Sequence, residues 1–265
     1  CITAMDADHL DVYGSAEALG SAFRAFAGTI KYNGKLLVRN GLPLRGITYG
    51  IDDGADYSAK NIRIGNSAYV FDIATPGETI PDVQFNKPGR HNLLNALAAF
   101  AMAAEAGTPG IELAGALATF KGIKRRFSYH IKTDTCIYID DYAHHPAEID
   151  AVYDAIREMH PGKAVLAVFQ PHLFSRTQDF ADAFAASLSR FDKIFLLDIY
   201  PARELPIAGV SSEWLLSKIS NPNKKLVSKA TLVREIKQAG APVILTIGAG
   251  DIGEEVEHIK KALSV

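Results

Sequence analysis

The densest group of chemically capable side chains is DDYAHHP, residues 140–146, in which two carboxylates precede two imidazoles. Pro146 suits the first turn of a helix, so His144 and His145 should lie near a helix N-terminus, where anionic ligands are favoured. Such a set could bind ribose hydroxyls, a metal ion or a carboxylate. The alternative is a capping acid beside solvated histidines, and His145 in particular fits either role.

A second motif, QPHLFSR (170–176), places His172 and Arg176 four residues apart where a helix should begin. An arginine can hold a carboxylate through two parallel hydrogen bonds, so this pair is a candidate substrate-binding group. Arg203 follows the next predicted strand and adds a further cation. The alternative for the pair is an ordinary helix start on the surface.

Three polar residues open a predicted helix in the first half of the chain, namely His91, Asn92 and Asn95. Asn92 and Asn95 are three residues apart and share a helix face. An amide side chain offers both a donor and an acceptor, which suits the edge of an adenine ring. Ordinary helix capping is the alternative.

Two smaller clusters are weaker candidates. Asp6, Asp8 and His9 offer oxygen and imidazole ligands for a divalent cation, although three such residues often lie close together by chance. The pair Arg125-Arg126 lies where the sequence changes character, and it could reach a phosphate or simply be solvated.

The glycine-rich motifs argue against two familiar nucleotide sites. GAGDIG (248–253) fits the G-x-G-x-x-G pattern, but the acid that a dinucleotide site needs about 20 residues later would fall beyond Val265. We therefore expect a tight turn that faces the same cleft as the other motifs. No G-x-x-x-x-G-K-[ST] phosphate loop is present, because the Gly-Lys pairs at 34–35 and 162–163 are followed by Leu and Ala.

The elements that must position these residues change in character near residues 120–127. Before this point we expect strands at 34–40 and 67–73 and helices at 91–107 and 111–120. After it, near-continuous apolar strands alternate with helices, which predicts an α/β domain with a mostly parallel sheet and helices on both faces. The expected strands are 135–139, 163–169, 193–199, 225–228 and 241–247, and the expected helices are 146–160, 176–190, 212–219, 230–238 and 251–263. Ligands of such sheets bind beyond the carboxyl ends of the strands, where the polar motifs fall.

The composition limits the class of protein. The 265 residues are 48% hydrophobic with a formal charge of −2, which fits a globular fold and excludes a broad basic surface for nucleic acid. Two cysteines cannot form a disulfide framework, and no apolar run reaches the length of a membrane span. We expect a cytoplasmic protein with no nucleic-acid partner and no membrane insertion. No signal peptide is visible. The chain also lacks a starting Met, so we expect a piece of a longer protein.

Taken together, these motifs resemble the Mur ligase family. The matching segments run in order from residue 6 to residue 252: DADHLDVYG, GRHNLLNALAA, GIKRRF, DDYAHHPAEI, FQPHLFSRT, LLDIYPARELPIAGVSSE and TIGAGDI. The resemblance implies that residues 1–124 are part of a central α/β ATPase domain without its phosphate loop. It also implies that residues 125–265 are a Rossmann-like C-terminal domain. A partial sheet leaves an exposed edge, for which homodimerisation and disorder are both open outcomes.

The resemblance also implies a bacterial activity in peptidoglycan synthesis, and the motifs match the alanine-adding ligases of the family. In that reaction ATP phosphorylates the carboxylate of UDP-N-acetylmuramate. The amine of L-alanine then attacks the acyl phosphate, and a tetrahedral intermediate expels phosphate. A fragment without the phosphate loop should be inactive alone.

The same resemblance implies roles for individual residues. For the nucleotide, it implies that adenine is received by His91, Asn92 and Asn95, that Arg126 reaches the phosphates and that Asp141 reaches the ribose. It implies that His9 helps to hold Mg²⁺ and that catalysis involves His144 and Arg176. Substrate would be bound by His145, His172, Arg176 and Arg203. One departure concerns Leu173, where many relatives have Arg. Arg176 or Arg203 would then carry more of the carboxylate binding.

Three other interpretations stay open at this point. A murein tripeptide recycling ligase shares the DDxAHHP pattern and would accept a tripeptide in place of alanine. A non-catalytic module that binds a nucleotide or a protein partner would also lack a phosphate loop. An NAD oxidoreductase would rest on GAGDIG alone and would need an acid after a further strand, which the sequence does not contain.

Overall fold

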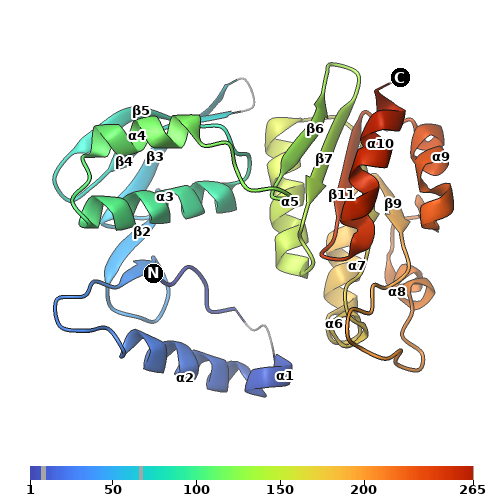
Figure 1. The fold of residues 1–265 in the computed structure, drawn as a ribbon, viewed down its shortest axis with the longest axis horizontal. Coiled ribbons are helices and arrows are strands. Elements are labelled where there is room, and N and C mark those ends of the chain that lie inside the picture. Colours follow the sequence, from blue (N-terminus) through green and yellow to red (C-terminus); the bar gives the residue numbers. More distant parts are fainter. Residues whose placement is uncertain (7–9, 66–67, 265) are drawn as a thin grey trace. The chain divides into compact units, whose positions relative to one another are not determined.

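The computed structural model describes residues 1–6, 10–65 and 68–264. The chain divides into two compact units, Cys1–Lys121 and Gly122–Val265. Each unit has its own β-sheet (Figure 1). The change of character in the sequence near residues 120–127 lies at this division.

The first unit is built on a five-stranded sheet whose strands lie side by side in chain order. They are β1 (Leu37–Arg39), β2 (Ile47–Ile51), β3 (Tyr57–Gly65), β4 (Ala68–Ala74) and β5 (Thr79–Phe85). The first three are parallel, and β3, β4 and β5 pair antiparallel. β1 and β4 confirm the strands expected at 34–40 and 67–73, whereas the sequence analysis missed β2, β3 and β5.

The helices of the first unit are α1 (Leu10–Tyr13), α2 (Ala16–Ala27), α3 (Arg90–Glu105) and α4 (Gly110–Thr119). α3 and α4 confirm the two predicted helices to within two residues at each end. α2 was not predicted, and it begins at Ser15, whose hydroxyl accepts a hydrogen bond from the Ala18 amide at 3.2 Å. This contact satisfies one of the free amides at the helix start.

The second unit contains a six-stranded sheet in the order β10-β9-β8-β11-β7-β6. Its strands are β6 (Ser128–Lys132), β7 (Ile137–Asp141), β8 (Val165–Phe169), β9 (Lys193–Leu196), β10 (Lys224–Leu226) and β11 (Val243–Ile247). All pairings are parallel except that of β6 with β7. The prediction of a mostly parallel sheet is therefore confirmed. β6 was missed because its residues are only partly buried and show no clear apolar pattern.

Side chains that alternate along these strands form two separate cores, one on each face of the sheet. Ile137 and Ile139 of β7 lie in a cluster with α5 (Pro146–Met159), α7 (Ala181–Ser189) and α8 (Ser212–Lys218). Tyr138, between them, lies in the cluster formed with α9 (Lys229–Ala239) and α10 (Val256–Leu263). This alternation is the two-residue period of a strand with both faces buried. Helices on both faces are thus confirmed.

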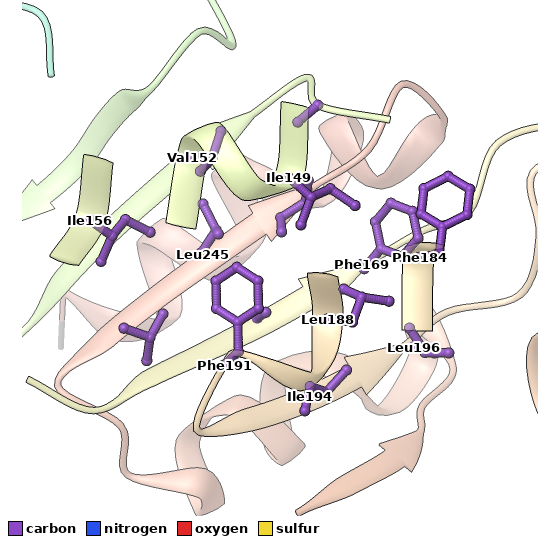
Figure 2. Packing of buried hydrophobic residues seen from close by; sticks show 14 of the residues in the cluster. Ile149, Val152, Ile156, Phe169, Phe184, Leu188, Phe191, Ile194, Leu196 and Leu245 are labelled. Carbon is purple, nitrogen blue, oxygen red and sulfur yellow. The ribbon is translucent and has the colours of Figure 1, made fainter. Parts of the chain in front are cut away.

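Figure 2 shows the first of these clusters. Ile149, Val152 and Ile156 of α5 and Phe184 and Leu188 of α7 point toward the sheet. The strand residues that they meet include Phe169, Ile194, Leu196 and Leu245. The face therefore packs as one apolar layer between the strands and the helices.

Several predicted elements have different bounds in the structure, and the strand expected at 193–199, for example, ends at Leu196. The helix expected at 176–190 is two helices, α6 (Phe174–Asp179) and α7, with a break at Phe180. The ring of Phe180 packs against the core and meets the His145 ring at 4.7 Å. The helix expected at 251–263 begins as a 3-10 turn, η1 (Asp251–Glu255), before α10. The strand expected at 135–139 continues through Asp140 and Asp141, which the sequence analysis had placed in a loop.

None of the helices in the described part of the chain is both long and apolar enough to span a bilayer.

We expect Phe184→Ala to destabilise the second unit by about 3–5 kcal/mol, the usual effect of deleting a buried aromatic side chain. Phe184 is 1% exposed and its ring lies 5.5 Å from that of Phe169. Leu205→Ala is the control, because Leu205 is 86% exposed, and it should change stability by no more than about 0.5 kcal/mol. Urea unfolding followed by circular dichroism measures both. Equal effects of the two variants would contradict this description of the core.

Candidate active site

The polar motifs of the second unit meet where three parallel strands end together. In the sheet, β11 lies between β7 and β8, so the ends of all three strands are neighbours. Ile247 of β11 is in register with Asp141 of β7 and with Phe169 of β8. The carboxyl edge of such a sheet is the usual position of a ligand site.

Asp140 forms a buried ion pair at this edge. Its carboxylate is fully buried and accepts hydrogen bonds from Arg125 Nε (2.8 Å) and from Thr246 Oγ1 (2.8 Å). Arg125 Nη2 also donates to the carbonyl oxygen of Gly248 at 2.7 Å. The Arg125 guanidinium is therefore engaged within the second unit, and its reach to a phosphate stays a prediction.

Asp141, predicted to reach a ribose, holds the loop that follows β7. Its Oδ2 accepts from the Phe127 amide (2.7 Å) and its Oδ1 from the Ala143 amide (2.7 Å). Burial raises the pKa of the Asp141 carboxyl to about 6, although these two hydrogen bonds and Arg126 act in the opposite direction. The side chain is 2% exposed. Contact with a ligand would have to use the second lone pair of an oxygen that already accepts one hydrogen bond.

His145 begins helix α5. Its Nδ1 accepts from the Ala147 amide at 3.4 Å, and the Glu148 carboxylate accepts from the amides of His144 (2.8 Å) and His145 (3.2 Å). This is a reciprocal capping box with histidine in the place of the usual serine or threonine. Sequence reasoning missed Glu148, although its position three residues after His145 is the spacing that such a box requires.

His144 faces the neighbouring motif. Its Nδ1 lies 3.0 Å from the carbonyl oxygen of Tyr142 and 3.4 Å from Glu148 Oε2. Since a carbonyl only accepts hydrogen bonds, Nδ1 carries the hydrogen and Nε2 of the neutral ring keeps its lone pair. The ring centroid of His144 is 6.1 Å from that of His172.

His172 lies between two basic side chains and a tyrosine. Its backbone bridges to Tyr200, and the two rings stack with centroids 5.8 Å apart. Its Nδ1 is buried and has no hydrogen-bond partner among the described residues. Burial, together with the charges of Arg176, His144 and Arg203, lowers the pKa of His172. We refer to His144, His172, Arg176 and Arg203 as the basic cluster.

Arg176 is carried by α6, and Arg126 lies in the segment that precedes β6. Leu173 precedes α6 with φ of 70° and donates from its amide to the Tyr200 carbonyl oxygen at 3.0 Å. The Arg126 guanidinium lies 3.6 Å from Glu148 Oε1 and 5.7 Å from the centre of the Tyr142 ring. Its side chain is 46% exposed, so it can reach a ligand.

The glycines of GAGDIG are explained by packing within the protein. A Cβ on Gly250 would lie 2.4 Å from Gln170 Oε1, and a Cβ on Gly253 would lie 2.6 Å from Arg125 Nη1. Gln170 is held in place, because it donates to Asp251 Oδ1 (2.7 Å) and accepts from the Ile252 amide (2.8 Å). The segment is the tight turn that the sequence analysis preferred, and these contacts account for its glycines without a dinucleotide.

The predicted adenine-binding residues open α3 in the first unit. Gly89 precedes the helix with φ of 97°, and its amide donates to Tyr69 Oη at 3.0 Å. The side-chain amide of Asn92 donates to the Pro88 carbonyl oxygen at 2.6 Å, so part of its hydrogen-bonding capacity supports the helix start. His91 is half-buried and Asn95 is exposed on the next turn.

The metal-binding prediction lies largely outside the part of the chain that the structure describes, because Asp8 and His9 fall within residues 7–9. Within the described ranges no group of three or more His, Cys, Asp or Glu side chains could hold a metal ion.

We expect Gly250→Ala to destabilise the second unit by about 1–3 kcal/mol, because the added methyl group forces apart side chains that are already hydrogen-bonded. Gly115→Ala is the contrasting variant. Gly115 lies inside α4 with no atom within 4 Å of an added Cβ, so alanine should stabilise by about 0.5–1 kcal/mol. Thermal unfolding of both variants tests the opposite signs, and an unchanged Gly250→Ala protein would contradict the packing argument.

We expect Arg176→Met to raise the pKa of His172, because it removes one of the charges that lower it. The matched control is Arg190→Met, since Arg190 pairs with Asp150 and Asp154 on α5. NMR titration of the histidine rings measures both. The lowered pKa means that His172 contributes stability above the unfolded value of about 6.5, and that this contribution is lost as the pH falls below it. Arg176→Met should reduce that loss, and an unchanged His172 titration would place Arg176 outside the cluster.

Comparisons with known proteins match both parts of the chain. The sequence model of the Mur ligase middle domain matches residues 1–103, and that of the Mur ligase glutamate ligase domain matches residues 125–252. A UDP-N-acetylmuramate–L-alanine ligase of Christiangramia forsetii is 63% identical over 262 residues, which are 99% of this chain and 58% of that protein. The chain thus spans a little over half the length of this relative.

Solved structures show the same fold. The UDP-N-acetylmuramate–alanine ligase of Thermotoga maritima matches with a TM-score of 0.78 at 24% identity, over 99% of this chain and 59% of that one. The MurF ligase of Thermotoga maritima in complex with ADP matches with a TM-score of 0.74 at 16% identity, over 99% of this chain and 62% of that one. The two sequence models carry the assignment, and the chain belongs to the Mur ligase family.

Proposed function

We propose that this chain is part of an ATP-dependent ligase of peptidoglycan synthesis that joins L-alanine to UDP-N-acetylmuramate. The observation that carries the proposal is the basic cluster at the carboxyl edge of β7 and β8. The identity of 63% with the ligase of Christiangramia forsetii supports this choice of substrates. In this proposal residues 1–124 are part of the central ATP-binding domain and residues 125–265 are the C-terminal domain.

The basic cluster binds the carboxylate of L-alanine in this proposal. Arg176 supplies parallel donors for the two carboxylate oxygens, and His172, Arg203 and His145 complete the substrate side. Leu173 supplies no charge, so Arg176 and Arg203 carry the cationic contribution. In the neutral tautomer whose Nδ1 donates to the Tyr142 carbonyl oxygen, Nε2 of His144 carries the lone pair. In the proposal, this nitrogen takes a proton from the attacking amine.

The proposal also assigns residues of each unit to parts of the nucleotide. His91, Asn92 and Asn95 receive the adenine, Asp141 the ribose, and Arg126 the phosphates. ATP transfers its γ-phosphoryl group to a carboxylate oxygen of UDP-N-acetylmuramate and leaves as ADP. The alanine amine attacks the carbonyl carbon of the acyl phosphate, loses a proton, and phosphate departs. Arg126 and Arg176 contribute by positioning and by neutralising charge.

Mg²⁺ with His9 as a ligand stays part of the proposal. The described residues provide no set of donors for a metal ion, so no step is assigned to it. The substrates of this reaction are cytoplasmic, and we place the protein in that compartment. Homodimerisation through an exposed edge of the partial sheet also stays a prediction, as does disorder at that edge.

A chimera tests the function directly. In it, residues 1–265 replace the matching part of the Christiangramia forsetii ligase, which supplies the remaining length of the protein. We expect phosphate release with ATP, Mg²⁺, UDP-N-acetylmuramate and L-alanine, and none from the 265-residue chain alone, since it contains no phosphate loop.

The amino substrate separates the remaining alternatives. Release only with L-alanyl-D-glutamyl-meso-diaminopimelate would indicate a recycling ligase and overturn the roles of His172 and Arg176. An inactive chimera that unfolds with the same midpoint as the Christiangramia forsetii ligase would favour a non-catalytic binding module.

A further inference from the structure

Glu204 is an acidic residue placed next to the basic cluster, in the loop between β9 and α8. Its Oε2 accepts from the Ser175 amide (3.0 Å) and its Oε1 from the Ser175 hydroxyl (2.5 Å). Although burial acts against it, hydrogen bonds from Ser175 and Phe174 hold the pKa of Glu204 below its ordinary value. Both oxygens of the carboxylate are therefore engaged by the start of α6.

These contacts supply a helix cap that α6 lacks locally. The residue before the helix is Leu173, whose side chain cannot accept a hydrogen bond, and no side-chain cap is formed there. The first amides of a helix have no partner within the helix itself. Glu204, 29 residues after Ser175, provides one. The direction of α6 at its start thus depends on a contact from a distant loop.

A second set of contacts joins the same two segments through the backbone. The Leu173 amide donates to the Tyr200 carbonyl oxygen (3.0 Å), and the Tyr200 amide donates to the Pro171 carbonyl oxygen (2.8 Å). Leu173, which makes the first of these contacts, adopts φ of 70°. A non-glycine residue in this region needs its surroundings to hold it there. Tyr200 and Glu204 together do so.

We propose that Glu204 is a positioning residue, which fixes the first turn of α6 so that Arg176, His172 and Arg203 bind a single substrate carboxylate. This inference rests on the proposed function. Glu204 itself touches no substrate in this arrangement, because its oxygens face the amides and the hydroxyl of α6. It also keeps an acid beside the basic cluster without occupying the site where a carboxylate would bind.

The test is an NMR titration of the 265-residue chain with L-alanine, followed on the ring signals of His172 and His144. We expect saturable shifts of these ring signals in the wild-type chain. In Glu204→Gln we expect about tenfold weaker binding, because the NH2 group of glutamine cannot accept a hydrogen bond from Ser175. Glu213→Gln is the matched control. Glu213 lies exposed in the first turn of α8, so the same loss of charge there should leave the affinity unchanged.

A second readout separates positioning from folding. Glu204 raises the pKa of His172 electrostatically, so Glu204→Gln should lower it in a folded chain, and Glu213→Gln should not. Ser175→Ala removes one partner of Glu204 while keeping the amide, and we expect it to weaken alanine binding less than Glu204→Gln does. In the chimera, Glu204→Gln should raise KM for L-alanine about tenfold and leave KM for ATP within twofold.

The outcomes are distinguishable. No response of the wild-type chain to L-alanine would contradict the proposed function of the basic cluster, and with it the role of Glu204. Binding that is equal in the wild-type chain and in folded Glu204→Gln would contradict the role of Glu204 alone. Equal weakening by Glu204→Gln and Glu213→Gln would indicate an effect of net charge and would also overturn the inference.

Discussion

The ion pair of Arg125 with Asp140 determines how the carboxyl edge of the second sheet is organised. A carboxylate that is fully buried costs several kcal/mol unless it is paired and hydrogen-bonded. Asp140 has no exposed surface, and it meets this requirement through Arg125 and Thr246. Because Arg125 also binds the Gly248 carbonyl oxygen, one guanidinium joins the segment before β6, the end of β7 and the turn after β11.

The other features of this edge follow from that arrangement. Arg125 lies so close to residue 253 that glycine is needed there, and the fixed amide of Gln170 has the same effect at Gly250. With Asp140 committed to the ion pair, the neighbouring Asp141 holds the loop from Ala143 onward. That loop ends in the capping box of His145 and Glu148, which turns His144 toward His172. The geometry of the basic cluster therefore begins with a buried charge.

The sequence predicted the parts of this structure that depend on local pattern. Near-continuous apolar runs located the buried strands, and Pro146 correctly marked the start of α5. The local pattern did not predict that Asp140 and Asp141 lie inside β7. The partner that makes a buried Asp140 tolerable is Arg125, which lies 15 residues away in the sequence. The cap of α6 was missed for the same reason, since Glu204 is 29 residues from Ser175. Half-exposed strands such as β6 lack the pattern on which prediction depends.

The basic cluster brings positive charge close to the buried ring of His172. Burial and the positive charges of Arg176 and Arg203 all disfavour a proton on His172, and Glu204 opposes them only in part. The hydrogen-bonding capacity of Glu204 is directed to α6, so it organises the cluster without filling it. In the proposed function, the carboxylate of the substrate would offset this unfavourable charge. Because α6 is held in advance, that binding does not have to order the helix start as well, and this preorganisation favours both affinity and a defined position for the attached amine.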